Sequence, residues 1–169
     1  ITVFTSAELT AKSGTFGNYP AVVHARGESI HLEVGQIIVA TGFDSYQPEA
    51  GELGYGIDGV LTLPEWKQLL DSGDGPVVVN GKPVETVAYV YCVGSRDAER
   101  PYCSRFCCSA AVHASLSASG RDANLRQYHL YRDLRTYGRN ELMLTESRKR
   151  GSLYLKFADD DPPDVARTD

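Results

Sequence analysis

The sequence has no cysteine outside one short window, and it lacks several other features that would place it in a class. No apolar run approaches the roughly 18 residues of a membrane-spanning helix. The first residues carry neither a basic segment nor a long apolar one, so they do not resemble a secretory signal. The net charge is −5, which argues against a nucleic-acid-binding surface. We therefore expect a cytoplasmic protein with no direct membrane span and no nucleic-acid partner.

Motifs for acid–base or nucleophilic catalysis are also missing. No serine lies in a G-x-S-x-G context, which excludes the usual hydrolase elbow. The histidines show no metal-ligand spacing such as H-E-x-x-H, so we expect each of them to be structural. We assign no catalytic residue in the sense of an acid, a base or a nucleophile.

The first half of the chain predicts strands followed by a short helix. Residues 1–40 alternate apolar and polar side chains between turn signals, which indicates a compact antiparallel unit. Within it, the apolar run 36–40 predicts a buried strand that ends at Thr41-Gly42, where the backbone can approach a ligand. Residues 62–73 predict a helix with Thr62 as N-cap and Glu65 in a capping box. Asn80-Gly81 predicts a small hairpin.

The second half has the pattern of a nucleotide-binding unit. Residues 85–158 read as strand, helix, strand, helix and strand, which predicts a βαβαβ unit with right-handed crossovers. The near-continuous apolar run 85–94 is typical of a strand at the centre of a parallel sheet. The fold class is therefore α/β, with a boundary near residues 75–84.

All the cysteines lie in the stretch CVGSRDAERPYCSRFCC: Cys92, Cys103, Cys107 and Cys108. Without a secretory signal such a cluster indicates metal binding or redox chemistry more than disulfides. A [4Fe–4S] cluster, which takes four thiolates, suits this set best. Zinc stays open, although the paired C-x2–4-C motif is missing. Also open are a disulfide, buried cysteines without a ligand, and a redox pair formed by Cys107 and Cys108.

The loop and the helix that follows it suggest how four thiolates would be supplied. Cys92 leaves the end of a strand, and Cys103 and Cys107 share one face if both lie on the helix. Cys108 then points about 100° away, so it joins only through a local irregularity. Backbone N–H groups at the start of the helix would stabilise the negative charge of a cluster. Three arginines act in the same direction: Arg96, Arg100 and Arg105.

This loop also stands where a dinucleotide-binding domain carries its G-x-G-x-x-G turn. Here the turn keeps Gly94 but no glycine fingerprint, and its bulk would obstruct a pyrophosphate. We therefore expect that NAD(P) is not bound and that a cluster lies in the same crevice.

The stretch YCVGSRDAERPYCSRFCC closely resembles the CVGSRD…PYCSRVCC signature of the A subunit of heterodisulfide reductase and its relatives. These are flavin and iron–sulfur proteins, and they include subunits of quinone-interacting oxidoreductase complexes. The segment IIVATGFDSYQP resembles the family's flavin-domain ATG segment, and GYGIDGVLTLPEWKQLLDSGDGP resembles the linker after it. YRDLRTYG is similar to the stretch that follows the cluster helix. The likeness extends roughly over residues 1–165.

The resemblance implies a thioredoxin-reductase-like architecture. Residues 1–75 would be part of an FAD domain with its linker, and residues 76–169 a Rossmann-like lobe shaped like an NADPH domain. The four cysteines would hold a [4Fe–4S] cluster, and Ala40, Thr41 and Gly42 would lie against FAD. Electrons would pass between the flavin and a chain of clusters, in an oxidoreductase subunit that works with other subunits of a redox complex. The alternative is a zinc- or cluster-stabilised module that docks partner subunits.

Two family features are missing from the sequence. There is neither an N-terminal glycine-rich nucleotide motif nor a C-x2-C-x2-C-x3-C ferredoxin run. The chain also opens with Ile1 in what reads as a strand. We therefore expect a fragment of a longer protein that is not active alone, with FAD bound in the full-length form.

Overall fold

The computed structural model describes residues 1–167 and has a mixed α/β fold. Its contacts divide the chain into two compact units, Ile1–Asp44 and a second that begins at Ser45. The boundary expected near residues 75–84 separates a partial FAD-domain segment and its linker from a Rossmann-like lobe. The contacts of this chain do not test that boundary, and it stays a prediction.

The first unit is a three-stranded antiparallel sheet. Strands β1 (Ala7–Lys12), β2 (Tyr19–Ala25) and β3 (Glu28–Val34) follow one another in the order β1-β2-β3. A two-residue turn, Arg26-Gly27, joins β2 to β3, and both residues have positive φ (53° and 84°) as in a type I′ hairpin. The prediction of a β-rich antiparallel start is confirmed.

The predicted strand over residues 36–40 is wrong. These residues form no regular element, and Ile38 and Val39 keep 85% and 78% of their surface exposed. An apolar run becomes a strand only where a neighbouring strand takes up its backbone hydrogen bonds, and no described strand pairs with this one. Gly42 has a φ of 72°, a conformation that glycine adopts readily.

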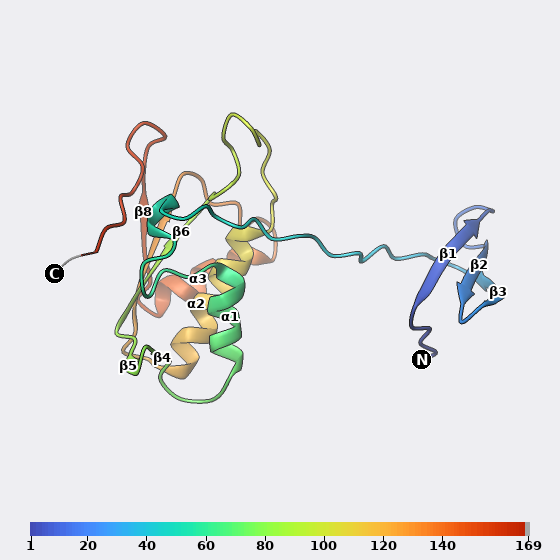
Figure 1. The fold of residues 1–169 in the computed structure, drawn as a ribbon, viewed down its shortest axis with the longest axis horizontal. Coiled ribbons are helices and arrows are strands. Elements are labelled where there is room, and N and C mark those ends of the chain that lie inside the picture. The colour runs from blue at the N-terminus through green and yellow to red at the C-terminus, as the bar shows by residue number, and fades with distance from the viewer. Residues whose placement is uncertain (168–169) are drawn as a thin grey trace. The chain divides into compact units, whose positions relative to one another are not determined.

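The second unit contains a three-stranded parallel sheet and its crossover helices (Figure 1). Strands β6 (Thr86–Val90), β7 (Arg126–Tyr131) and β8 (Leu153–Lys156) lie in the order β6-β7-β8. Helix α2 (Cys107–Arg121) joins β6 to β7, and α3 (Asn140–Lys149) joins β7 to β8. The βαβαβ prediction is confirmed.

Strand β6 lies at the edge of this sheet, which corrects the expectation of a central strand. Among the described residues it pairs with β7 only. Its apolar run reflects the burial of its side chains, with Tyr89 and the following Tyr91 in the core. A run of apolar side chains indicates that both faces of a strand are buried. It does not show whether the strand pairs with one neighbouring strand or with two.

The connection before β6 follows the local signals closely. Helix α1 (Leu63–Asp71) begins with a capping box, in which the Thr62 N–H donates to Glu65 Oε2 at 2.7 Å and the Glu65 N–H donates to Thr62 Oγ1 at 3.4 Å. A short 3₁₀ turn, η1 (Glu52–Gly54), precedes it. The predicted hairpin is present as β4 (Val78–Val79) and β5 (Lys82–Pro83), which pair around Asn80-Gly81.

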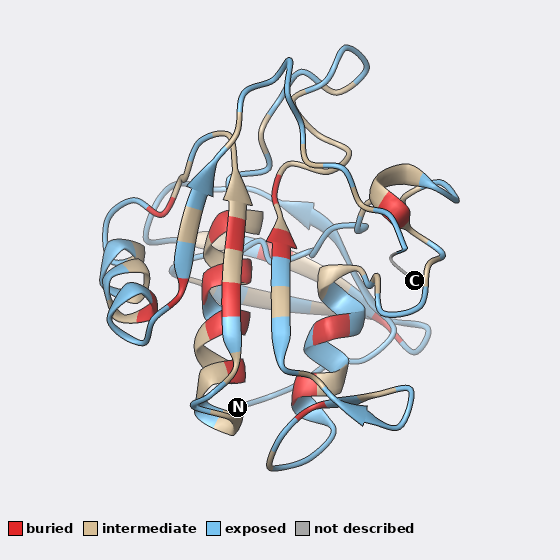
Figure 2. Ribbon diagram, turned by 90° about the vertical axis from the view of Figure 1, so that its left-hand side faces the viewer, coloured by how far each residue is buried: buried red, intermediate tan, exposed pale blue. Residues whose placement is uncertain are grey.

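The core lies between the sheet and the helices on one of its faces. Helix α2 packs against both α1 and α3, and its small residues Ala111, Ala114 and Ala118 lie in one buried cluster with Tyr89 and Tyr91. Figure 2 shows buried residues along the strands and the helix behind them, and exposed residues on most of the connections. Trp66 of α1 closes the core and donates through Nε1 to Tyr89 Oη at 3.1 Å.

His129 stands at the centre of this core and is fully buried. Its ring stacks between those of Tyr89 and Tyr154, at centroid distances of 4.6 Å and 4.2 Å. Its two ring nitrogens lie 2.8 Å from Tyr91 Oη and 3.2 Å from Ser115 Oγ. Burial lowers the pKa of His129 to about 4. The imidazole is therefore a neutral, hydrogen-bonded part of the core, as expected of a structural histidine.

Arg121 is expected to be the main polar link between α1 and α2. It donates to the carbonyl oxygens of Gly75 (2.6 Å), Leu69 (2.7 Å) and Leu70 (3.1 Å), and so caps the end of α1. Arg121→Ala should lower the free energy of unfolding by about 2 kcal/mol, because charged hydrogen bonds to partly buried carbonyls are lost. Urea denaturation measures this; the exposed Arg126→Ala should change it by less than about 0.5 kcal/mol.

Candidate metal centre

The cysteine loop, residues 91–106, lies at the carboxyl end of the parallel sheet. It leaves β6 after Val90 and leads into α2. The residues that leave β7 reach the same place, because Cys108 Sγ lies 3.9 Å from the carbonyl oxygen of Asp133. In open parallel sheets, ligands bind in the crevice outside the carboxyl ends of the strands. The loop therefore occupies the position of a ligand-binding turn.

All four cysteines are free thiols, and three of them form one interacting group. Cys108 belongs to the buried core, with Cys92 and Cys107 packed against it. The Cys108 thiol donates to the sulfur of Cys107, which holds the pKa of Cys107 below its usual range. Ser104 and the backbones of Cys108 and Cys92 act in the same direction, and burial opposes them. The hydrogen bond to Cys107 and burial together raise the pKa of Cys108.

Cys103 stands apart from this group. Helix α2 begins at Cys107, so the expectation that Cys103 and Cys107 share a helix face does not hold. Cys103 lies in the loop, where its Sγ accepts the N–H of Arg105 at 3.3 Å. A hydrogen-bonded loop conformation, with Arg105 at a φ of 60°, replaces the extra helical turn. Within residues 1–167, no three His, Cys, Asp or Glu side chains converge closely enough to hold a metal ion.

The backbone of the loop adopts conformations that L-residues avoid. Cys92, Arg96 and Arg105 have φ values of 64°, 62° and 60°, and Gly94 has 66°. Each non-glycine residue in this region costs on the order of 1 kcal/mol and persists only where its surroundings enforce it. Such clusters of strained residues are typical of ligand-binding segments.

Arg96 supplies positive charge beside Cys92. Its Nη2 lies 2.9 Å from Asp133 Oδ2. Burial acts to lower the pKa of Arg96, but the side chains of Cys92 and Asp133 raise it above the ordinary value. Its Nη1 is buried and has no hydrogen-bond partner among the described residues. A donor therefore remains for a further acceptor next to the thiols.

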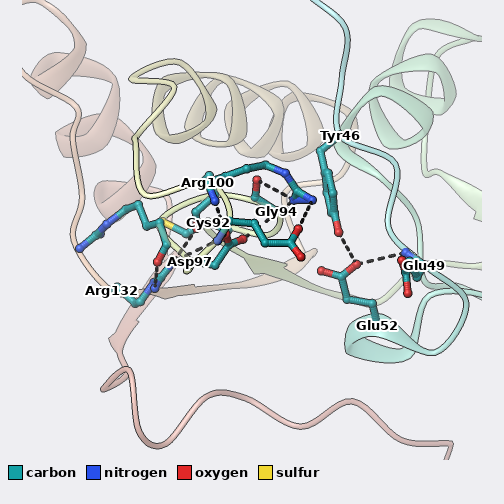
Figure 3. Close-up of polar contacts among 11 residues, drawn as sticks. Tyr46, Glu49, Glu52, Cys92, Gly94, Asp97, Arg100 and Arg132 are labelled. Atoms are coloured by element: carbon teal, nitrogen blue, oxygen red, sulfur yellow. Dashed lines mark hydrogen bonds and ion pairs between the residues drawn. The ribbon is translucent and has the colours of Figure 1, made fainter.

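Arg132 fixes the backbone of the loop from the end of β7. Its guanidinium donates to the carbonyl oxygens of Cys92 (3.4 Å), Ser95 (2.8 Å) and Arg96 (3.0 Å). Figure 3 shows it reaching the Cys92 end of the loop. The sequence reasoning missed this residue. Its place directly after a parallel strand was the available signal, because such positions meet at one edge of the sheet.

The two other arginines named from the sequence have different surroundings. Arg100 is partly buried and forms ion pairs within the loop, with Asp97 and Glu99. The side chain of Arg105 is exposed, and its backbone contacts Cys103. The positive charge closest to the cysteines is therefore that of Arg96.

The donor set fits an iron–sulfur cluster in its chemistry. Four thiols, a spare guanidinium N–H and the first N–H groups of α2, which have no partner inside the helix, all favour bound negative charge. Because no three of the described His, Cys, Asp or Glu side chains converge closely enough to hold a metal ion, cluster binding requires the loop to rearrange and bring the four sulfur atoms together.

The predicted flavin contacts, Ala40, Thr41 and Gly42, are exposed residues of the first unit. No contact in the structure tests their role, which stays a prediction. Among the described residues, no helix combines the length and apolarity needed to cross a membrane.

Comparison with known proteins identifies relatives of the chain. No family model matches it. Over 140 residues, 76% of the chain, it is 34% identical to the A subunit of the H(2):CoB-CoM heterodisulfide,ferredoxin reductase of Methanothermobacter thermautotrophicus, and it covers 21% of that protein. It is 35% identical over 122 residues to the iron-sulfur A subunit of the CoB–CoM heterodisulfide reductase of Methanocaldococcus jannaschii, covering 66% of this chain and 18% of that one.

A third relative agrees with these two. The A subunit of the Ferredoxin/F(420)H(2)-dependent CoB-CoM heterodisulfide reductase of Methanosarcina acetivorans is 36% identical over 139 residues, which is 76% of this chain and 18% of that protein. The chain thus spans about a fifth of the length of the curated relatives it matches. The resemblance noted in the cysteine motif is confirmed. The chain belongs to the family formed by the A subunits of heterodisulfide reductases.

Proposed function

We propose that this chain holds one [4Fe–4S] cluster on Cys92, Cys103, Cys107 and Cys108, and transfers electrons between that cluster and an adjacent FAD. One observation carries the proposal: the only four cysteines of the chain lie in the cysteine loop and the first turn of α2, at the carboxyl end of a parallel sheet, and Cys107 and Cys108 interact with each other. The name of one relative, which calls it an iron-sulfur subunit, supports the choice of iron and sulfide over zinc.

Each part of the site has a task in this proposal. Cys107 and Cys108 are presented by the first turn of α2, and Cys92 by the end of β6. A lowered thiol pKa, as at Cys107, favours the thiolate that ligates iron. Arg96 and the N–H groups at the start of the helix would donate toward negative charge and so raise the reduction potential of a bound cluster. The cluster itself would supply one-electron transfer.

The proposal also includes the cofactor and the partner subunits that surround the cluster. Ala40, Thr41 and Gly42 lie against FAD in a thioredoxin-reductase-like arrangement, and the Rossmann-like lobe binds no NAD(P), because the loop at its crevice carries cysteines in place of a glycine fingerprint. The chain acts as part of an oxidoreductase subunit in the cytoplasm, together with other subunits of a redox complex. The relatives are named as subunits of such reductases.

Anaerobic reconstitution with iron and sulfide tests the proposal. We expect a broad visible absorption band that dithionite bleaches and that air destroys. A colourless protein that binds zinc in a one-to-one ratio would support the alternative of a docking module. Two thiols that become blocked on mild oxidation, with no iron taken up, would instead identify Cys107 and Cys108 as a redox pair.

A further inference from the structure

Tyr46 packs directly on the cysteine loop. Its ring lies against the backbone of Gly94, so closely that a Cβ atom at residue 94 would overlap the ring. Gly94 also has a φ of 66°, which a residue with a side chain adopts only with strain. Glycine is therefore required here for two reasons, and one of them is the contact with Tyr46.

The side chain of Arg100 completes the contact from within the loop. Its Cζ lies 4.6 Å from the centroid of the Tyr46 ring, in the geometry of a cation–π interaction. Its Nη1 lies 3.5 Å from the carbonyl oxygen of Gly94. In Figure 3 the Tyr46 ring stands beside the Arg100 guanidinium, and its hydroxyl points toward Glu52.

A carboxylate holds the Tyr46 ring in this orientation. The hydroxyl of Tyr46 donates to Glu52 Oε2 at 2.8 Å, and the N–H of Glu49 donates to the same oxygen at 3.1 Å. Glu52 opens the short turn η1. The Tyr46 ring is thus fixed in two ways. Glu52 of the turn η1 binds its hydroxyl, and Gly94 and Arg100 of the cysteine loop pack against its face.

The contact reaches the residues next to the thiols through the backbone. The carbonyl oxygen of Arg100 accepts the N–H of Arg96 at 2.6 Å, and the N–H of Arg100 donates to Asp97 Oδ1 at 2.6 Å. Arg96 in turn lies beside Cys92. A displacement of Arg100 would therefore disturb the segment between Cys92 and Cys103.

We propose that Tyr46 is a positioning residue that clamps the cysteine loop: its ring seats Gly94 and Arg100, and Glu52 holds the ring. Tyr46 follows the Ala40-Thr41-Gly42 segment by four residues in the sequence, so the clamp also ties the loop to the chain that leaves the predicted flavin contacts. The existence of the clamp does not depend on a bound group. Its role in placing Cys92 and Cys103 for a cluster rests on the proposed function.

Hydrogen exchange of the metal-free chain tests the clamp without any cluster. In Tyr46→Ala, the hydrogen-bonded amides of residues 95–100 should exchange about tenfold faster, because the loop opens more often. Tyr46→Phe keeps the ring but loses the hydrogen bond to Glu52, so its loop exchange should lie between that of Tyr46→Ala and that of the original chain. The control is Tyr137→Ala, an exposed tyrosine outside the loop, which should leave these amides unchanged.

Two further measurements separate loss of the clamp from loss of the fold. Peptides of β7 should stay protected in every variant, which shows that the sheet is intact. Arg100→Gln removes the guanidinium from the ring and should speed loop exchange as Tyr46→Ala does. Unchanged loop exchange in both variants, with β7 protected, would overturn the proposal.

A cluster-based readout distinguishes this inference from the proposed function. After reconstitution, Tyr46→Ala should lose its visible absorption in air several-fold faster than the original chain, and the rate for Tyr46→Phe, which lacks only the hydrogen bond to Glu52, should lie between the two. If no variant takes up iron while Tyr46→Ala still loosens the loop, the clamp stands and the cluster assignment fails. Equal rates of cluster loss in Tyr46→Ala and the original chain would contradict the role of the clamp in placing the cysteines.

Discussion

Cys107→Ser is expected to reduce the iron retained after anaerobic reconstitution from about four atoms per chain to less than about one. Cys107 is the thiol whose sulfur accepts hydrogen bonds from Cys108 and Ser104, and whose pKa is lowered most clearly. A serine hydroxyl ionises far less readily than a thiol and is a poor ligand for iron. The same loss is expected for Cys92→Ser, Cys103→Ser and Cys108→Ser. Iron analysis after desalting measures it.

Ser109→Ala is the matched control for these substitutions. Ser109 is the neighbour of Cys108, and its Oγ is buried without a hydrogen-bond partner among the described residues. Its replacement should leave iron retention unchanged and should not weaken the fold, because no hydrogen bond is lost. The outcome that would contradict the account is full iron retention in Cys103→Ser, since the proposed site needs the fourth thiol.

Acidification from pH 7.5 to pH 5 is expected to lower the free energy of unfolding by about 2 kcal/mol through His129 alone. Burial lowers the pKa of His129 to about 4 in the folded chain, against an ordinary value of 6.5. The unfolded chain therefore binds a proton that the folded chain excludes. The stabilisation is complete above pH 6.5 and is lost as the pH falls toward 4. Urea denaturation at both pH values measures the change.

His129→Phe removes the titrating group and should abolish most of this pH dependence, at the cost of two hydrogen bonds, to Tyr91 and Ser115. His113→Gln replaces an exposed imidazole on α2 and serves as the control, in which the loss of stability persists. A pH dependence in His129→Phe equal to that of the original chain would show that His129 is not the group responsible.

Local signals in the sequence predicted most of the second unit. The capping box at Thr62 and Glu65, the Asn80-Gly81 hairpin and the alternation of strands and helices each depend on interactions between near neighbours in the chain. Such interactions can be read without knowing the rest of the fold. The same holds for the cysteine spacing, which identified the family that the relatives confirm.

The misjudged elements depend on partners that lie far away in the sequence. Residues 36–40 have the composition of a strand but no described strand to pair with, and β6 has an apolar pattern that does not reveal its edge position. Cys103 and Cys107 do not share a helix face, because helical spacing of two cysteines does not show which residues the loop holds by its own hydrogen bonds. Tyr46 and Arg132 act on the loop over separations of 48 and 40 residues. Nothing in the immediate sequence of Tyr46 indicates its contact, whereas Arg132 carries one signal, its place directly after a parallel strand.

Iron and acid-labile sulfide in the chain isolated without oxygen test the central claim most directly. The account predicts about four of each per chain, together with an electron paramagnetic resonance signal that appears on one-electron reduction. A chain that carries no iron, takes up none on reconstitution and binds zinc instead would contradict it.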